Sequence, residues 1–246
     1  MKIHIYKDEY ELGVAAGQKA AQLIKDVIQE KGQANIILAT GASQFQTLNY
    51  LIHDNSINWN KVVMFHLDEY IGITDTHKAS FRKYLRERFL EKVIPLKEVF
   101  LISGNTNPAQ ECNKLKSLIQ QYSIDIALAG IGENGHLAFN DPPADFKTEE
   151  PYIIVNLDNA CRRQQFNEGW FNSIDEVPLK AISMSIKQIM KSKYIICSVP
   201  DERKAQAVKN ILENEVSNLF PASILQMHSD CDIYLDIKSA SLLQKH

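Results

Sequence analysis

Three glycines and one histidine follow a short apolar run in the middle of the chain. The run covers residues 124–129, and the segment after it reads GIGENGHLAFNDPP. Histidine is the side chain whose charge changes most readily near neutral pH, and an acid or amide on its second nitrogen fixes its tautomer. His136 lies between Asn134 and Asp141. We therefore expect these residues to move protons, although a histidine that only hydrogen-bonds within the core is the usual alternative.

The same glycines fit the G-x-G-x-x-G pattern of dinucleotide-binding loops. That pattern requires the third glycine to open a helix, whereas Pro142 and Pro143 exclude a regular helix soon after Gly135. No obvious acid for a ribose follows at the end of the next strand. The segment therefore favours an acid–base site over a nicotinamide or flavin site, and we expect no cofactor.

Two adjacent acids, Asp68 and Glu69, follow another apolar run at residues 62–67. Neighbouring side chains at the end of a strand point in different directions, so one acid can face a ligand while the other takes a structural partner. A loop acid that merely caps the next element is the alternative, and position alone slightly favours it. His136 shifts the balance toward a site.

A possible phosphate cradle follows a third apolar run. Thr40, Gly41, Ala42 and Ser43 lead directly into a predicted helix, where backbone N–H groups, hydroxyls and the positive end of the helix dipole can hold a phosphate. An ordinary helix N-cap uses the same residue types, so the segment alone supports both interpretations.

Cations that could complete such a site lie later in the chain. Arg162 and Arg163 follow the run that ends at Leu157, and Lys204 lies in the first turn of a predicted helix. A cation is unfavourable at a helix N-terminus, and a bound phosphate would explain it there. A solvated lysine is the alternative.

The composition is that of an ordinary globular protein. The chain has 246 residues, 45% of them hydrophobic, and a net charge of 27 − 30 = −3, which does not favour nucleic acid or an anionic membrane. We expect one domain over residues 1–246, cytoplasmic, with no membrane partner and with its oligomeric state undetermined. The four cysteines form no C-x-x-C pair, and we expect no metal.

Strands and helices alternate along the whole chain. The predicted strands cover residues 2–6, 35–39, 62–67, 99–102, 124–129, 152–157, 180–185, 193–199 and 231–236. The predicted helices cover residues 10–31, 44–53, 80–93, 108–122, 186–191, 201–213 and 220–227, with residues 159–171 ambiguous. This alternation predicts an α/β fold, a doubly wound, mostly parallel sheet with helices on both faces, as in Rossmann-like proteins. Ligands bind such sheets at the carboxyl ends of the strands, where all the candidate residues lie.

Together these segments resemble the glucosamine-6-phosphate deaminases, also called isomerases, which share a superfamily with the 6-phosphogluconolactonases. The resembling stretches are LATGAS, LDEYIG, GIGENGHLAFNDP, SIDEVPLKAISMSI and FPASILQMHSD. The lactonase branch is expected to carry an arginine after the D-E pair and T-A-S-L-F-P after the G-H pair. This chain has Tyr70 and residues 137–140 (LAFN) at these places.

The resemblance implies that a 2-amino-2-deoxyhexose 6-phosphate reacts with water to give a ketose 6-phosphate and ammonia. It implies that Asp68 moves a proton between C2 and C1 and that His136 opens the sugar ring. Asn134 and Asp141 match the positions that flank and orient this histidine. No metal or organic cofactor is implied.

The resemblance also implies a phosphate site. Ser43, Arg162 and Lys204 match its side chains, and the backbone of Gly41 and Ala42 lies alongside. Arg162 is assigned rather than its neighbour by its distance from the preceding strand.

Three departures from the family pattern bear on the substrate more than on the fold. Ala42 and Gln44 replace the usual residues of a T-G-G-T-P or T-G-S-T-P loop, Asp141 replaces a glutamate, and residues 158–171 carry about two extra positions. Galactosamine 6-phosphate is therefore a second candidate substrate. A sugar-phosphate lactonase and a non-catalytic sugar-phosphate sensor are alternative functions. Because the chain stops soon after its last strand, we expect a divergent member like the shorter, non-allosteric ones.

Overall fold

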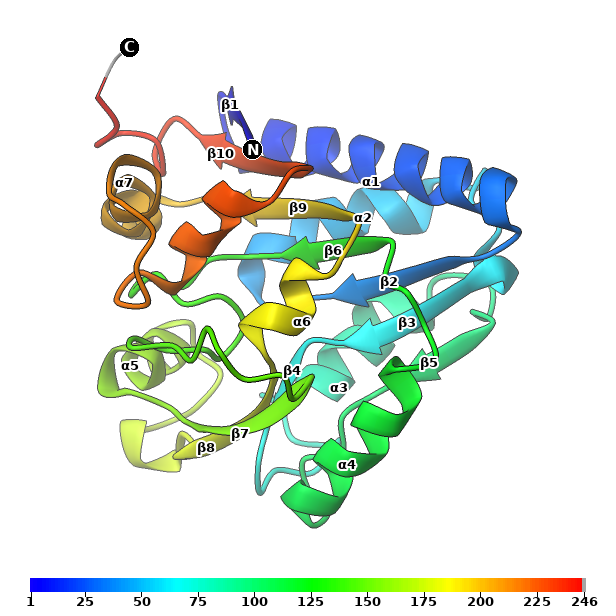
Figure 1. Ribbon diagram of the computed structural model, residues 1–246. Coiled ribbons are helices and arrows are strands. Elements are labelled where there is room, and N and C mark those ends of the chain that lie inside the picture. Colours follow the sequence, from blue (N-terminus) through cyan, green and yellow to red (C-terminus); the bar gives the residue numbers. More distant parts are fainter. Residues whose placement is uncertain (245–246) are drawn as a thin grey trace.

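The computed structural model describes residues 1–244 and is built on a seven-stranded parallel sheet (Figure 1). From edge to edge the strands are β1 (Lys2–Tyr6), β10 (Cys231–Asp236), β9 (Tyr194–Val199), β6 (Ile126–Ala129), β2 (Ala34–Leu38), β3 (Val62–His66) and β5 (Glu98–Phe100). Every pairing in this sheet is parallel. The predicted α/β fold class is confirmed, and the predicted domain over residues 1–246 extends two residues beyond the described range.

Helices cover both faces of this sheet because the side chains of each strand alternate between the faces. The helices are α1 (Glu9–Lys31), α2 (Phe45–His53), α3 (Phe81–Leu85), α4 (Pro108–Ile119), α5 (Asn159–Asn167), α6 (Ile186–Met190) and α7 (Ala205–Glu213). In β2, Ile36 and Leu38 pack in one apolar core with α1, α2 and α3, whereas Ile37 packs in the other with α4, α6 and α7. The sheet is therefore doubly wound, as predicted.

A smaller antiparallel sheet lies beside the large one and was not distinguished by the sequence. It consists of β4 (Asp68–Tyr70), β8 (Lys180–Met184) and β7 (Tyr152–Asn156). A short apolar run looks the same in either kind of sheet, so periodicity could not separate these strands from the parallel ones. An aromatic core that includes Tyr70 and Phe139 packs against this sheet. The small sheet matters because β4 carries Asp68.

Short 3₁₀ segments and one π-helical turn connect these elements. They are η1 (Ala42–Gln44), η2 (Trp59–Lys61), η3 (Arg86–Leu90, the π turn), η4 (Ile174–Glu176), η5 (Glu202–Lys204) and η6 (Pro221–Met227). The helix expected over residues 80–93 is thus interrupted, since α3 ends at Leu85 and η3 continues with wider hydrogen-bonded turns. The ambiguous residues 159–171 contain α5.

The strand order places a crevice at the centre of the molecule. From β2 the chain builds outward to β3 and β5, then returns to place β6 on the other side of β2. The connections at the carboxyl ends of β2 and β6 consequently diverge, and such points bind ligands in open α/β sheets. In Figure 1 the arrows of β2, β6 and β9 point toward the left side, where α5 and α7 lie.

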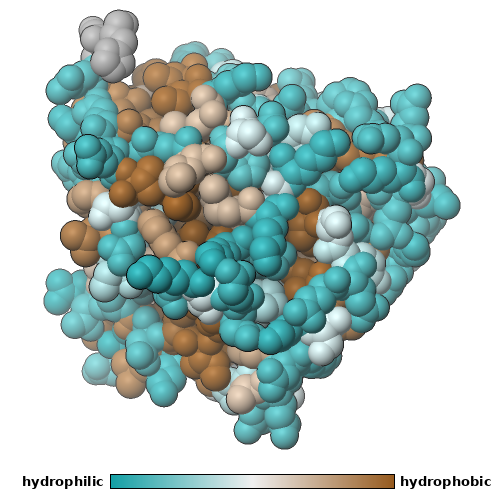
Figure 2. All heavy atoms as spheres, viewed as in Figure 1, coloured by the Kyte–Doolittle hydropathy of each residue, from teal (hydrophilic) through white to brown (hydrophobic). Residues whose placement is uncertain are grey.

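The surface seen in the same view is mostly polar, and its apolar areas are small and scattered (Figure 2). Within residues 1–244, no helix combines the length and the apolar character needed to cross a membrane.

Candidate active site

One cleft lies where β2, β3, β6 and β9 end. Its walls are the segments that follow these strands, closed on one side by α5. The lining residues include Glu9, Thr40, Gly41, Ala42, Ser43, Asp68, Phe81, Gly130, Gly132, His136, Phe139, Gln164, Gln165, Glu168, Asp201, Arg203 and Lys204. The structure therefore brings together most of the residues singled out in the sequence, although they lie far apart along the chain.

The carboxyl group of Asp68 is the buried acid of this cleft. Asp68 is only 6% exposed, and no described residue donates a hydrogen bond to its carboxylate. Burial, followed by the negative charge of Glu69, raises the pKa of Asp68 from 3.8 to about 8. A carboxyl group with such a pKa accepts a proton readily near neutral pH, which is the property a general base needs.

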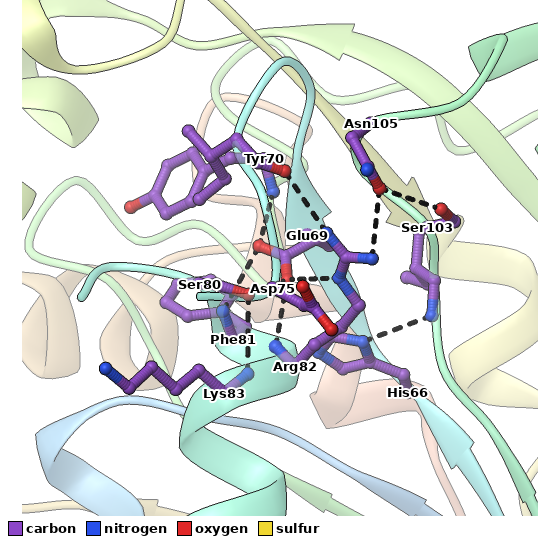
Figure 3. A network of polar contacts seen from close by, with 12 residues as sticks. His66, Glu69, Tyr70, Asp75, Ser80, Phe81, Arg82, Lys83, Ser103 and Asn105 are labelled. Atoms are coloured by element: carbon purple, nitrogen blue, oxygen red, sulfur yellow. Dashed lines mark hydrogen bonds and ion pairs between the residues drawn. The ribbon is translucent and has the colours of Figure 1, made fainter. Parts of the chain in front are cut away.

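Glu69 does not line the cleft, and its side chain points toward Ser80, Phe81 and Arg82 at the start of α3 (Figure 3). Its carboxylate accepts hydrogen bonds from the backbone N–H groups of Tyr70, Phe81 and Arg82 at 2.9, 3.2 and 2.8 Å. The Ser80 hydroxyl donates at 2.9 Å, and Arg82 Nε lies 3.4 Å away. Burial raises the pKa of Glu69 above its usual value, and these hydrogen bonds act in the opposite direction by stabilising the ionised carboxylate. The two adjacent acids thus divide their roles as the sequence suggested, since one faces the cleft and the other is structural.

Arg82 extends this anchor to neighbouring loops. Its guanidinium donates from Nη1 to Asn105 Oδ1 at 3.2 Å and from Nη2 to the carbonyl of Ile73 at 3.1 Å. Figure 3 shows these contacts around Glu69. Because β4 has only three residues, these contacts add to the few strand hydrogen bonds that hold the Asp68 backbone in place.

His136 is held by a chain of acids and amides behind it. Its Nδ1 lies 3.1 Å from Asp141 Oδ1. Asn134 Nδ2 donates to Asp141 at 2.9 Å and to Asp158 at 3.0 Å, and the backbone N–H of Asp158 donates to Asp141 Oδ2 at 2.9 Å. Since Nδ1 is engaged, Nε2 is the nitrogen available to a ligand. A methyl group on Gly132 would lie 2.2 Å from the His136 ring, so only glycine permits this ring position.

Asp141 is suited to orient the imidazole as a charged partner. Burial alone would raise its pKa, but the hydrogen bond and charge of His136, with the Asn134 amide and the Asp158 N–H, lower the pKa below its usual value. The shorter side chain that departs from the family pattern therefore still reaches the histidine.

The loop after β2 has the form of an anion cradle. Gly41 adopts a φ of 94°, which glycine tolerates far better than other residues, and its carbonyl accepts a hydrogen bond from the Tyr84 hydroxyl at 2.9 Å. The Gly41 carbonyl is held in this way, and the first residues of the following turn, η1, line the cleft. Their backbone N–H groups can bind an anion there.

Gln44 explains one departure from the family pattern. Its Nε2 donates to Ser43 Oγ at 3.1 Å and to the carbonyl of Ala129 at 2.9 Å, and its side chain is buried. Because Ser43 Oγ accepts from Gln44, its own proton is free to be donated into the cleft. The glutamine thus orients the hydroxyl that the sequence assigned to phosphate.

Lys204 lines the cleft at the end of η5 and is only 6% exposed. Burial lowers its pKa, and within residues 1–244 its Nζ has no hydrogen bond or ion pair. A buried ammonium without a protein partner is costly, and an anionic ligand would stabilise it.

Comparison with known proteins identifies the fold and the family. A family model described as glucosamine-6-phosphate isomerases/6-phosphogluconolactonase matches residues 7–234. The chain belongs to this family. It is 36% identical to a glucosamine-6-phosphate deaminase of Oenococcus oeni over 247 residues, which cover 100% of both chains. It is 35% identical to glucosamine-6-phosphate deaminase 1 of Bacillus subtilis over 232 residues, covering 92% of this chain and 94% of that one.

Solved structures agree with this assignment. A monomeric glucosamine-6-phosphate deaminase matches with a TM-score of 0.91 and 34% identity, covering 99% of this chain and 100% of the other. A 6-phosphogluconolactonase from Trypanosoma brucei matches with a TM-score of 0.80 and 18% identity, covering 99% and 98%. The second likeness shows the shared fold alone. The resemblance inferred from the sequence is confirmed.

Arg162, assigned to the phosphate by its resemblance to the family pattern, does not line the cleft. Its Nε and Nη2 donate to the carbonyl of Val177 at 3.2 and 3.1 Å, and Nη2 also donates to Ile174 at 2.6 Å. The cause is the phase of α5, which begins at an Asp158 N-cap and turns this arginine toward η4. In this structure Arg162 therefore lies outside the cleft lining, and its assignment to the phosphate stays a prediction. Arg163 is exposed.

The residues that α5 does present to the cleft escaped the sequence analysis. Gln164, Gln165 and Glu168 share one helical face, and Gln165 Oε1 accepts a hydrogen bond from the Tyr70 hydroxyl at 2.7 Å. Identifying Asp158 as the N-cap would have set the helical phase and found them. In this structure, amides and a carboxylate line the wall on which a cation was expected.

Three metal-binding side chains, His136, Asp141 and Cys161, place donor atoms within 4.8 Å of one another. His136 and Asp141 are already hydrogen-bonded to each other, and burial, followed by nearby carboxylates, raises the pKa of the Cys161 thiol well above its usual value. His136 and Asp141 are therefore arranged to transfer a proton, and the Cys161 thiol beside them keeps its own proton.

Proposed function

We propose that this protein converts a 2-amino-2-deoxyhexose 6-phosphate and water to a ketose 6-phosphate and ammonia, with glucosamine 6-phosphate as the first candidate substrate. One observation carries the proposal. A buried carboxyl group with a pKa of about 8 and an imidazole backed by an acid line the same cleft, which also holds an anion cradle and a lysine without a partner among residues 1–244.

Ring opening is the first step that these residues support. The hemiacetal proton on O1 must leave and O5 must gain a proton, and His136 Nε2 can do both in turn while Asp141 stabilises the charged imidazole. Asn134 holds Asp141 in position through its amide. The product of this step is the open-chain aldehyde with its amine on C2.

Proton transfer at carbon follows. Asp68, as the carboxylate, removes the proton from C2, and the electron pair of the broken bond forms a C1–C2 double bond. At the same time O1 gains a proton, which the protonated amine on C2 gives up by way of His136 Nε2. Returning the proton from Asp68 to C1 leaves a C2–N double bond. Water adds to this imine at C2, and ammonia leaves to give the ketone. Placed acid–base groups contribute about 10²–10⁴-fold to such steps.

The phosphate end of the substrate supplies binding energy away from the reacting carbons. Ser43, Lys204 and the backbone of Gly41 and Ala42 are the groups proposed to bind it. Because they line the same cleft as His136 and Asp68, a phosphate bound there would help to align C1 and C2 with the acid–base pair.

The test is an ammonia-release assay with glucosamine 6-phosphate and galactosamine 6-phosphate in parallel, with identification of the ketose. The Asp68→Asn variant is the control, and its rate should fall by about 10²–10⁴-fold while hexose phosphate binding persists. Turnover of either substrate would support the reaction and name the epimer. Hydrolysis of a sugar-phosphate lactone without ammonia release, or binding without any turnover, would overturn the proposal.

A further inference from the structure

A second cation, Arg203, stands beside Lys204 at the edge of the cleft. Its Nε and Nη2 donate to Asp201 Oδ2 at 3.0 and 2.7 Å. Its Nη1 lies 3.3 Å from Glu133 Oε1, on the loop that carries His136. The side chain is 44% exposed, so a ligand can reach its Nη1 from the cleft edge while Nε and Nη2 stay on Asp201.

The cleft needs more than one cation to hold a phosphate monoester. Such a group carries a charge of about −1.5 to −2 at neutral pH. Among the residues within 1–244 that line the cleft, Arg203 and Lys204 are the only cations, whereas Glu9, Glu133, Asp201 and Glu168 bring negative charge to it or its rim. Arg162 is held elsewhere by two carbonyls. By position and charge, Arg203 is therefore the available second cation.

An anionic ligand could replace Glu133 as the partner of the Arg203 guanidinium. Glu133 Oε1 is buried and makes no hydrogen bond within the described chain, so only charge attraction links it to the guanidinium. The opposite side of the guanidinium is held firmly. Asp201, its partner there, adopts a φ of 87°, and its backbone N–H donates to Asp236 at 3.2 Å. One side of the arginine is thus fixed and the other is free to change partners.

Glu133 also connects this arginine to α5. The Glu133 backbone N–H donates to Gln164 Oε1 at 2.9 Å, and Gln164 Nε2 donates to Glu168 Oε1 at 2.9 Å. Trp170 Nε1 donates to the second oxygen of Glu168 at 3.1 Å. A change of partner at Arg203 would therefore act on the loop and helix that close the cleft.

We propose that Arg203 binds the substrate phosphate together with Lys204, and that Glu133 is the competing carboxylate it leaves when the phosphate arrives. The inference rests on the proposed function for the identity of the ligand as a hexose 6-phosphate. It assigns to Arg203 the part that the family pattern had suggested for an arginine on α5. A guanidinium pairs with phosphate through parallel hydrogen bonds that an ammonium cannot make.

The test is calorimetric titration with two probes that cannot release ammonia, inorganic phosphate and glucitol 6-phosphate. Arg203→Gln should weaken both by about tenfold, the effect of losing a charge-assisted hydrogen bond at a half-exposed site. Arg203→Lys should recover part of the affinity. Arg163→Gln is the matched control, because it removes an exposed arginine outside the cleft and should change neither affinity.

Glu133→Gln gives the sharper prediction. If its carboxylate competes with phosphate, the neutral amide should tighten glucitol 6-phosphate binding by about threefold, which a purely structural role would not do. The double variant Glu133→Gln/Arg203→Gln should bind no better than Arg203→Gln alone. Thermal unfolding of each variant confirms that the fold is retained.

Two outcomes would overturn the inference: Arg203→Gln binding both probes within twofold of the unmodified protein, or Glu133→Gln weakening the binding. These outcomes are independent of turnover. Arginine-dependent phosphate binding in a protein that releases no ammonia would refute the proposed function and leave the inference standing. Ammonia release by a protein whose phosphate binding does not depend on Arg203 would support the proposed function and refute the inference.

Discussion

Replacing Asp68 with asparagine should stabilise the folded protein, and the gain should grow with pH. The carboxyl group has a pKa of about 8 in the folded protein, raised by burial and by the charge of Glu69, against 3.8 for an ordinary aspartate. Between these two values the folded state keeps a proton that the unfolded chain releases. Stability of the unmodified protein therefore falls as pH rises through this window and levels off above it.

The size of the effect follows from the shift. Each pH unit inside the window costs the unmodified protein about 1.4 kcal/mol, whereas asparagine stays neutral throughout. With these pKa values the advantage of Asp68→Asn grows from about 3 kcal/mol at pH 6 to about 5 kcal/mol at pH 8, then changes little. Loss of a hydrogen bond does not offset this gain, because no described residue donates to the carboxylate.

The measurement is urea unfolding of both proteins at pH 6, 7, 8 and 9, with no substrate present. Asp175→Asn is the matched control, because Asp175 is exposed and its replacement should give no pH-dependent difference. A difference between Asp68→Asn and the unmodified protein that stays constant from pH 6 to pH 8 would refute the reasoning. It would mean that Asp68 is ionised in the folded protein at neutral pH.

Three further predictions concern turnover. Because Asp68 must be ionised to take a proton, kcat/KM for ammonia release should rise about tenfold per pH unit below pH 8 and then level off, and a flat profile would remove Asp68 as the base. Gly132→Ala should lower kcat by about 100-fold, because its methyl group would displace the His136 ring from 2.2 Å away, and an unchanged rate would contradict that geometry. Gln44→Leu should raise KM about fivefold with little change in kcat, because Ser43 Oγ loses the donor that orients it. An unchanged KM, measured on a variant that melts like the unmodified protein, would exclude that role.

Much of the fold follows from local patterns. The alternation of apolar runs and amphipathic segments correctly predicted the parallel sheet, its crossovers and the position of the crevice beyond β6. The antiparallel sheet was missed because β4 has only three residues and pairs with β8 more than 100 residues later. Such a pairing depends on contacts between distant segments, for which a three-residue stretch carries no periodic signal.

In the candidate site, too, arrangements within one loop could be predicted from the sequence, whereas those that depend on the orientation of a helix could not. Asn134, His136 and Asp141 lie within one loop, so their short spacing in the sequence was enough to predict that they contact one another. The contacts of Arg162 could not be foreseen, because distance along the chain does not give the phase of a helix, and α5 turns this side chain toward backbone carbonyls instead of the cleft. The same helical phase turns Gln165 toward the cleft.

By itself, the sequence determined the fold class, the family and the loops that carry the proton-handling and anion-binding groups. These depend on residue types at short spacing, where backbone preferences and turn geometry act. Only the tertiary structure decided the raised pKa of Asp68, the structural role of Glu69 beside Arg82, and the position of Arg203 opposite Glu133. Burial and charge pairing are set by what distant segments place around a group, so they arise only when the chain is folded.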